Sequence, residues 1–191
     1  MRGKFIVLYG INNLGKTTQT KMLVDYFNKK GIQAEYLKYP IYDCQPTGPQ
    51  INQIIRARKQ TISEEELQAL YIQNRRDYEP HLWQKLAGGI NIMAEDYIGT
   101  GLAWGSAKGA DLGWLERCNQ GLLKPDKDIL LDGERFLEAK EAKHVHEQND
   151  ELMRRCRKNY LKLAKKYHWP IVRANQNIAK VHQEIIRVLE G

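Results

Sequence analysis

Cysteine is scarce in this chain of 191 residues, which contains only Cys44, Cys118 and Cys156. The three cysteines are widely spaced, and none forms a Cys-x-x-Cys pair or lies beside a histidine. An odd number at such spacing argues against a disulfide framework and against a zinc site. The pattern indicates reduced thiols in a cytoplasmic protein.

Long apolar runs are also missing. No window approaches the roughly 18 consecutive apolar residues that a membrane-spanning helix needs. Residues 1–4 lead directly into a short strand-like segment, without the longer apolar stretch and cleavage site of a signal peptide. Linkers, internal repeats and low-complexity tracts are absent as well. We therefore expect one domain over residues 1–191, in the cytoplasm and with no membrane partner.

Charge is not concentrated anywhere along the chain, although the net charge is +7. Basic residues alternate with acidic ones and form no stripe, so nucleic-acid binding is not expected. The positive balance fits an anionic ligand, and it fits a solvated basic surface equally well.

Strand and helix patterns alternate from one end of the chain to the other. Apolar continuity and flanking turn residues predict five strands, over residues 4–9, 33–39, 90–94, 128–132 and 169–174. This alternation predicts a three-layer α/β fold with about five parallel strands flanked by helices.

Helical periodicity appears between most of these strands and after the last one. Helices are predicted from the first loop to Gly31, around residues 51–58, from Ser63 onward, over 152–167 and over 178–189. Ser63 and Glu66 form a capping box at the start of the long third helix. Pro80 is expected to break or kink this helix, and Gly88 to end it.

The motif "GINNLGKT", residues 10–17, follows the first strand and opens the first helix. It matches G-x-x-x-x-G-K-[ST], the phosphate-binding loop (P-loop). In such a loop the backbone N–H groups surround phosphate oxygens, Lys16 reaches the outer phosphates and Thr17 offers a hydroxyl to Mg²⁺. The loop therefore predicts binding of a nucleoside triphosphate with Mg²⁺. The residues that this loop assigns to ATP binding are Gly10, Asn12, Asn13, Leu14, Gly15, Lys16, Thr17 and Thr18.

The class of P-loop protein follows from size and from a missing motif. The chain is too small for a motor, and it lacks the guanine-reading Asn-Lys-x-Asp of a GTP-binding switch. A small phosphotransferase remains.

Further stretches resemble the thymidylate kinase family of nucleoside monophosphate kinases. In chain order they are "KFIVLYGINNLGKTTQ", "YLKYPIYDCQPTGPQINQIIR", "LQALYIQNRRDYEP", "AEDYIGTGLAWGSAKG", "LLKPDKDILLD" and "IVRANQNIAKVHQEIIRVL". The resemblance implies the P-loop kinase fold with a short lid near residues 138–150, and transfer of a phosphate from ATP to a deoxynucleoside monophosphate. It implies dTMP as the acceptor, dTDP as the product used for dTTP synthesis, and a homodimer.

The resemblance also implies roles for single residues. Tyr71 matches the ring that stacks on the acceptor base, and Arg75 the guanidinium that bonds the base edge; a half-buried core ring and a surface charge are the structural alternatives. Glu95 takes the place of an Asp near Mg²⁺ and the reacting phosphates. Tyr97 and Gly101 follow where the chain wraps the sugar and base, and Asn175 matches the loop beside the adenine of ATP, which adds it to the ATP-binding residues.

Four positions depart from the family pattern, all close to the phosphates. Asp96 and Tyr42 stand where the family has arginines that bind the acceptor phosphate. Asn12 replaces an acid near the acceptor sugar, and Asn13 stands where some members carry a catalytic arginine.

The lid has no arginine before Arg154, so Lys140 and Lys143 are the catalytic cations expected there. Two interpretations of the missing arginines stay open. In the first, other cations bind the acceptor phosphate; the candidates are Lys38, Arg56, Arg58, Arg75 and Arg76. In the second, the acceptor is an unphosphorylated nucleoside, and Asp96 or Glu95 serves as a base. A nucleotide-binding protein without transfer activity is the non-enzyme alternative.

Overall fold

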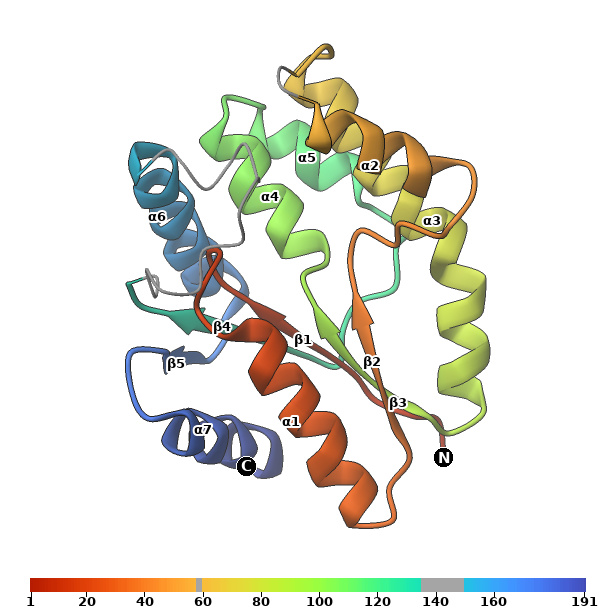
Figure 1. Ribbon diagram of the computed structural model, residues 1–191, viewed down its shortest axis with the longest axis vertical. Coiled ribbons are helices and arrows are strands. Elements are labelled where there is room, and N and C mark those ends of the chain that lie inside the picture. Colours follow the sequence, from red (N-terminus) through yellow and green to blue (C-terminus); the bar gives the residue numbers. More distant parts are fainter. Residues whose placement is uncertain (58–59, 135–149) are drawn as a thin grey trace.

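A single parallel sheet organises the computed structural model, which describes residues 1–57, 60–134 and 150–191 (Figure 1). Its strands stand in the order β2-β3-β1-β4-β5, and every neighbouring pair is parallel. The strands are β1 (Phe5–Tyr9), β2 (Ala34–Lys38), β3 (Asn91–Glu95), β4 (Lys127–Asp132) and β5 (Ile171–Arg173). The five predicted strands are therefore confirmed, with ends that shift by one or two residues.

Helices cover both faces of this sheet. In the described residues they are α1 (Lys16–Lys29), α2 (Thr47–Arg56), α3 (Glu64–Ala87), α4 (Ile98–Ala107), α5 (Leu112–Cys118), α6 (Asp150–Tyr167) and α7 (Ile178–Glu190). Helices α1 and α7 pack together on one side, and α4 packs against α3, α5 and α6 on the other (Figure 1). The three-layer α/β architecture is the predicted one.

The long helix α3 corrects one prediction. It begins at the predicted capping box, in which the Ser63 side chain accepts from the Glu66 backbone and the Glu66 side chain accepts from the Ser63 backbone. Of the break or kink expected at Pro80, the break is wrong, because the helix runs without interruption to Ala87. Burial of Leu82 and Leu86 on the core side outweighs the one backbone hydrogen bond that proline removes.

Within the described ranges, no helix combines the length and the apolar composition that crossing a membrane requires.

The partly buried carboxyl of Asp128, in strand β4, gives a testable pH dependence. Burial raises the pKa of Asp128 to about 6, although a hydrogen bond from Tyr9 acts in the opposite direction. Between the ordinary aspartate pKa and about 6, the folded chain therefore holds a proton that the unfolded chain releases. The free energy of unfolding attributable to Asp128 must fall as the pH rises through this window.

We expect Asp128→Asn to raise the free energy of unfolding at pH 7 by about 1–2 kcal/mol and to change it little near pH 4. Urea unfolding at both pH values measures the effect. Asp126→Asn cannot serve as the control, because Asp126 pairs with Arg2; exposed Asp25→Asn can. An equal gain at both pH values would contradict the assignment.

Candidate functional site

The P-loop lies at the carboxyl edge of the central strand β1, between the ends of β3 and β4. Gly10 has φ of 146°, and a Cβ there would come within 2.6 Å of the Leu131 carbonyl oxygen, so only glycine fits. Helix α1 begins at Lys16, directly after the loop, and its positive end therefore faces the loop interior. Parallel sheets bind ligands at this edge, outside the carboxyl ends of their strands.

Lys16 is almost fully buried inside the loop. Its Nζ donates to the carbonyl oxygens of Gly10 at 2.9 Å and Ile11 at 3.1 Å, and lies 3.9 Å from Asp96 Oδ1. The lysine is thus a positive charge held at the loop mouth next to the end of β3.

Glu95, the last residue of β3, connects the P-loop with β2. Its Oε2 accepts from Thr17 Oγ1 at 2.7 Å and from the Tyr36 hydroxyl at 2.8 Å, and its Oε1 lies 3.2 Å from Lys38 Nζ. Burial favours the neutral acid, yet Lys16, Lys38 and the two hydroxyl donors together hold the pKa of Glu95 below its usual value. The side chain is therefore a carboxylate at neutral pH, hydrogen-bonded to the threonine expected at Mg²⁺.

Asp96 takes up an unusual backbone conformation directly after this strand. Its φ of 63° is in the left-handed region, which few residues other than glycine adopt. The carboxylate accepts from Thr100 Oγ1 at 2.8 Å, and the Tyr160 hydroxyl in turn donates to Thr100. Burial and the neighbouring Glu95 raise the pKa of Asp96, against the attraction of Lys16.

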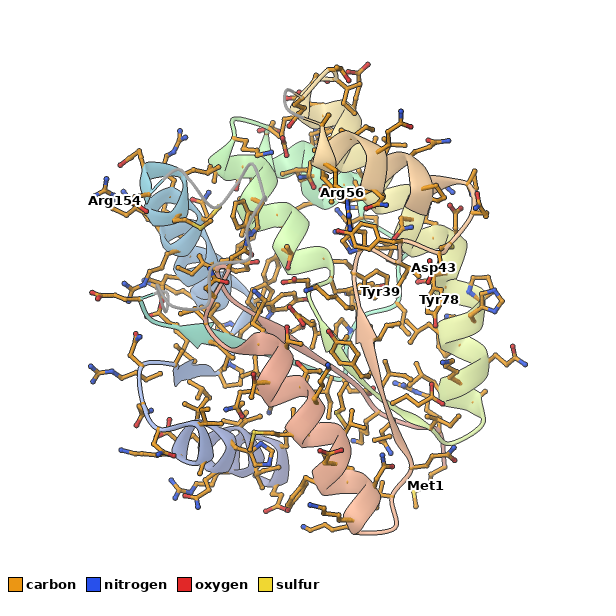
Figure 2. All side chains as sticks on the ribbon, viewed as in Figure 1. Met1, Tyr39, Asp43, Arg56, Tyr78 and Arg154 are labelled. Atoms are coloured by element: carbon orange, nitrogen blue, oxygen red, sulfur yellow. The ribbon has the colours of Figure 1, made fainter. Side chains whose placement is uncertain are left out.

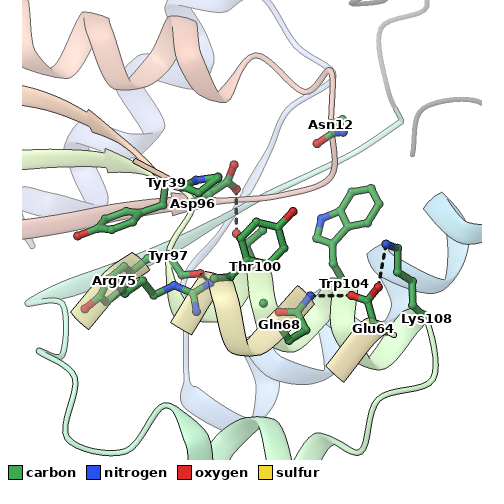
Figure 3. A pocket seen from close by; sticks show the side chains of 13 residues that line it. Asn12, Tyr39, Glu64, Gln68, Arg75, Asp96, Tyr97, Thr100, Trp104 and Lys108 are labelled. Atoms are coloured by element: carbon green, nitrogen blue, oxygen red, sulfur yellow. Dashed lines mark hydrogen bonds and ion pairs between the residues drawn. The ribbon is translucent and has the colours of Figure 1, made fainter. Parts of the chain in front are cut away.

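A pocket opens beside Asp96, between α3 and α4 (Figure 3). Asn12 brings the P-loop to its rim. The other lining residues are Tyr39, Pro40, Glu64, Gln68, Tyr71, Arg75, Asp96, Tyr97, Thr100, Gly101, Trp104 and Lys108. The pocket therefore joins the predicted donor site at one end and extends along two helices at the other.

The structure brings most of the predicted acceptor residues together here: Tyr71, Arg75, Asp96, Tyr97 and Gly101 all line the pocket. The alternative of a surface charge for Arg75 is wrong, because its side chain is buried and donates to the Tyr97 carbonyl at 3.0 Å and to Asn119 Oδ1 at 3.2 Å. Burial lowers the pKa of its guanidinium.

Other predicted residues lie elsewhere. Lys38 pairs with Glu95, and Tyr42 packs against the small apolar cluster of Ile51, Ile55 and Leu67. Asn175 accepts from the Glu134 backbone N–H, at the start of the segment that precedes α6. The lid residues Lys140 and Lys143, and also Arg58, lie outside the described residues.

The remaining candidate arginines, Arg76 and Arg56, do not line the pocket. Arg76 donates to the carbonyl oxygens of Cys118 and Gln120, and Arg56 is exposed at the end of α2. Arg154 pairs with Glu151 on α6 and lies at the outer edge of the molecule, whereas Tyr39 lies near its middle (Figure 2).

Sequence reasoning missed seven of the pocket-lining residues: Tyr39, Pro40, Glu64, Gln68, Thr100, Trp104 and Lys108. Glu64 and Gln68 are one turn apart on a predicted helix, and this spacing indicates that their side chains lie on the same face and can contact each other. Lys108 was not predictable, because its contact with Glu64 joins two helices distant in sequence. The same holds for Arg157, which binds Asp132 at the end of β4 through two hydrogen bonds of 2.7 and 2.9 Å.

Comparisons with known proteins agree with this geometry. The family model described as thymidylate kinase matches residues 8–185. A probable thymidylate kinase of Pyrococcus horikoshii is 31% identical over 205 residues, covering 100% of this chain and 97% of the relative. The thymidylate kinase of Dictyostelium discoideum is 27% identical over 193 residues, covering 100% and 86%.

A solved thymidylate kinase structure from Candida albicans superposes with a TM-score of 0.83, at 22% identity, covering 99% of this chain and 92% of that one. At this identity the match supports the fold.

Proposed function

Because the chain belongs to the thymidylate kinase family, we infer that it transfers the γ-phosphate of ATP to dTMP, giving ADP and dTDP. It is a phosphotransferase that uses ATP as the phosphate donor. The observation that carries the inference is the continuity of the site: Asn12 of the P-loop and Asp96 beside Lys16 line the same pocket as Tyr71 and Arg75. The family and the relatives give no support to a deoxynucleoside kinase.

For the donor end, we propose that Lys16 and the P-loop amides bind the triphosphate and that Thr17 and Glu95 hold Mg²⁺. A hydroxyl and a carboxylate 2.7 Å apart are the oxygen ligands that Mg²⁺ accepts, together with phosphate oxygens and water. When bound, Mg²⁺ would neutralise charge on the phosphates.

For the acceptor end, Tyr71 stacks on the base, Arg75 bonds the base edge, and Tyr97 and Gly101 shape the wall around the nucleoside. Lys38 takes the place of a missing arginine in this proposal, since its Nζ lies 3.2 Å from Glu95 Oε1 at the end of β3. For Lys140 and Lys143, which lie outside the described residues, the proposed role is to supply positive charge to the transferring phosphate. Asn175 packs beside the adenine of ATP. Phosphoryl transfer then depends on alignment and charge neutralisation, with little covalent work for the protein.

The test is ADP release with ATP and Mg²⁺, measured for dTMP and thymidine in parallel. We expect turnover on dTMP and none above background on thymidine, which would also mean that this chain binds the acceptor phosphate without the family's arginines. Turnover on thymidine alone would mean that the protein is a nucleoside kinase. ATP binding without any release of ADP would mean that it is a nucleotide-binding protein without transfer activity. Light scattering on the same preparation tests the homodimer that the family resemblance implies.

A further inference from the structure

Gln68, on α3, is a buried polar side chain with one free acceptor. It is 2% exposed and lines the acceptor pocket. Its Oε1 has no hydrogen-bond partner among the described residues. A buried carbonyl oxygen without a partner costs about 1–3 kcal/mol, so its presence in a pocket points to a ligand that donates to it.

The orientation of this amide is set by its neighbours. Gln68 Nε2 donates to Glu64 Oε1 at 2.7 Å, and Glu64 Oε2 accepts from Lys108 Nζ at 2.9 Å (Figure 3). A carboxylate only accepts hydrogen bonds, so the amide must turn its NH₂ group toward Glu64. The oxygen is thereby held on the opposite side.

Two glycines of α4 make room for this arrangement. A Cβ at Gly101 would lie 3.0 Å from Gln68 Oε1 and 3.0 Å from Arg75 Nη2. One turn later, a Cβ at Gly105 would lie 3.1 Å from the Gln68 side chain. The free acceptor and the guanidinium therefore converge on the same small area of the pocket wall, at Gly101.

Arg75 keeps donors beyond the ones it uses. A guanidinium has five N–H groups, and hydrogen bonds to Asn119 and Tyr97 account for two of them. Its Nε has no partner among the described residues. The wall thus presents a donor and an acceptor side by side.

We propose that Gln68 is a specificity-determining residue: its Oε1 accepts the N3–H of a 4-keto pyrimidine while Arg75 donates to the neighbouring O4. The proposal deepens the proposed function and rests on it. Thymine and uracil present a carbonyl beside an N–H, the complement of this pair. Cytosine presents an amino group beside an unprotonated ring nitrogen. Its amino donor would then face the Arg75 donor, and its N3 acceptor would face the Gln68 acceptor. Glu64, held by Lys108, acts through Gln68 as a positioning residue.

The experiment compares dUMP with dCMP, which are equal in size and differ only at this edge. Calorimetry gives the affinity of each nucleotide, and steady-state kinetics with ATP gives kcat and KM. We expect the unmodified chain to favour dUMP by about 100-fold or more. Gln68→Leu should weaken dUMP binding about 10- to 100-fold and change dCMP binding less than about threefold, because only dUMP donates to the lost oxygen.

Gln73→Leu is the matched control, since Gln73 is exposed on the same helix and bonds only to Asp77 in the described structure. Glu64→Gln is the second variant. A glutamine at position 64 can donate as well as accept, so the Gln68 amide is free to turn and the dUMP:dCMP affinity ratio should fall, with thermal unfolding near that of the unmodified chain. An unchanged ratio in Glu64→Gln would overturn the positioning role.

An unchanged ratio in a folded Gln68→Leu protein would overturn the proposal, whatever the turnover. If Gln68→Leu removes the preference in binding while no variant releases ADP, Gln68 stands and the kinase function fails. If the unmodified chain turns over dTMP but binds dUMP and dCMP with equal affinity, the kinase function stands and the role of Gln68 fails. Absence of binding by either nucleotide would overturn both.

Discussion

Lys16→Met should lower kcat for dTMP phosphorylation about 1,000-fold, the largest effect expected for any single substitution in this chain. The lysine is 5% exposed and lies between the P-loop carbonyls and Asp96, so no other described cation occupies its place. Methionine keeps the length of the side chain and removes its charge. The transferring phosphoryl group then lacks the positive charge that neutralises its oxygens in the transition state.

Steady-state ADP release measures this loss, with Lys29→Met as the control. Lys29 is an exposed lysine in the last turn of the same helix, and its replacement should leave kcat within about twofold, as surface changes usually do. Circular dichroism and thermal unfolding establish that both variants are folded. Retention of more than a tenth of the activity by Lys16→Met would show that another group carries the charge.

Glu95→Gln should lower kcat about 100- to 1,000-fold and raise the Mg²⁺ concentration needed for half-maximal activity. The amide has nearly the same shape, and the strand need not move. It removes the negative charge, however, and it offers an NH₂ group where the carboxylate accepts from Thr17 and Tyr36 and pairs with Lys38. Both the metal ligand and the order of this hydrogen-bonded cluster are lost.

A titration of activity against Mg²⁺ separates these effects. Glu35→Gln, on the adjacent strand β2, is the matched control because Glu35 pairs with Lys85 away from the P-loop. Its Mg²⁺ midpoint should equal that of the unmodified chain. The same midpoint for Glu95→Gln, with only kcat reduced, would assign Glu95 to the order of the cluster and take it away from the metal.

The elements whose cause is local could be predicted from the sequence. Residues close together in the sequence determine the apolar strand β1, the P-loop and the Ser63–Glu66 capping box. The structure confirms all three elements. The convergence of Tyr71 and Arg75 with Asp96 followed from the family resemblance, and the pocket contains all three.

Elements whose cause is distant could not be predicted. Helix α4 has Gly99, Gly101 and Gly105 among its ten residues, a composition that disfavours a helix when local preference alone is considered. It is helical because these glycines admit neighbours: a Cβ at Gly99 would lie 2.5 Å from Trp169 and 2.9 Å from Tyr9. The Glu64–Lys108 pair on the pocket wall arises in the same way, from helices that meet only after folding.

This dependence of α4 on its surroundings has a consequence for how the protein acquires its binding site. A short, glycine-rich segment has little reason to be helical before α3, α5 and α6 surround it, so the wall that carries Gly101 forms only as the chain completes its folding. Unfolding of that wall and loss of the acceptor pocket are then one event. An acceptor nucleotide that fills the pocket therefore stabilises α4, whose helix propensity is low, and with it the whole chain. The gain in the free energy of unfolding increases with the ratio of the nucleotide concentration to its dissociation constant.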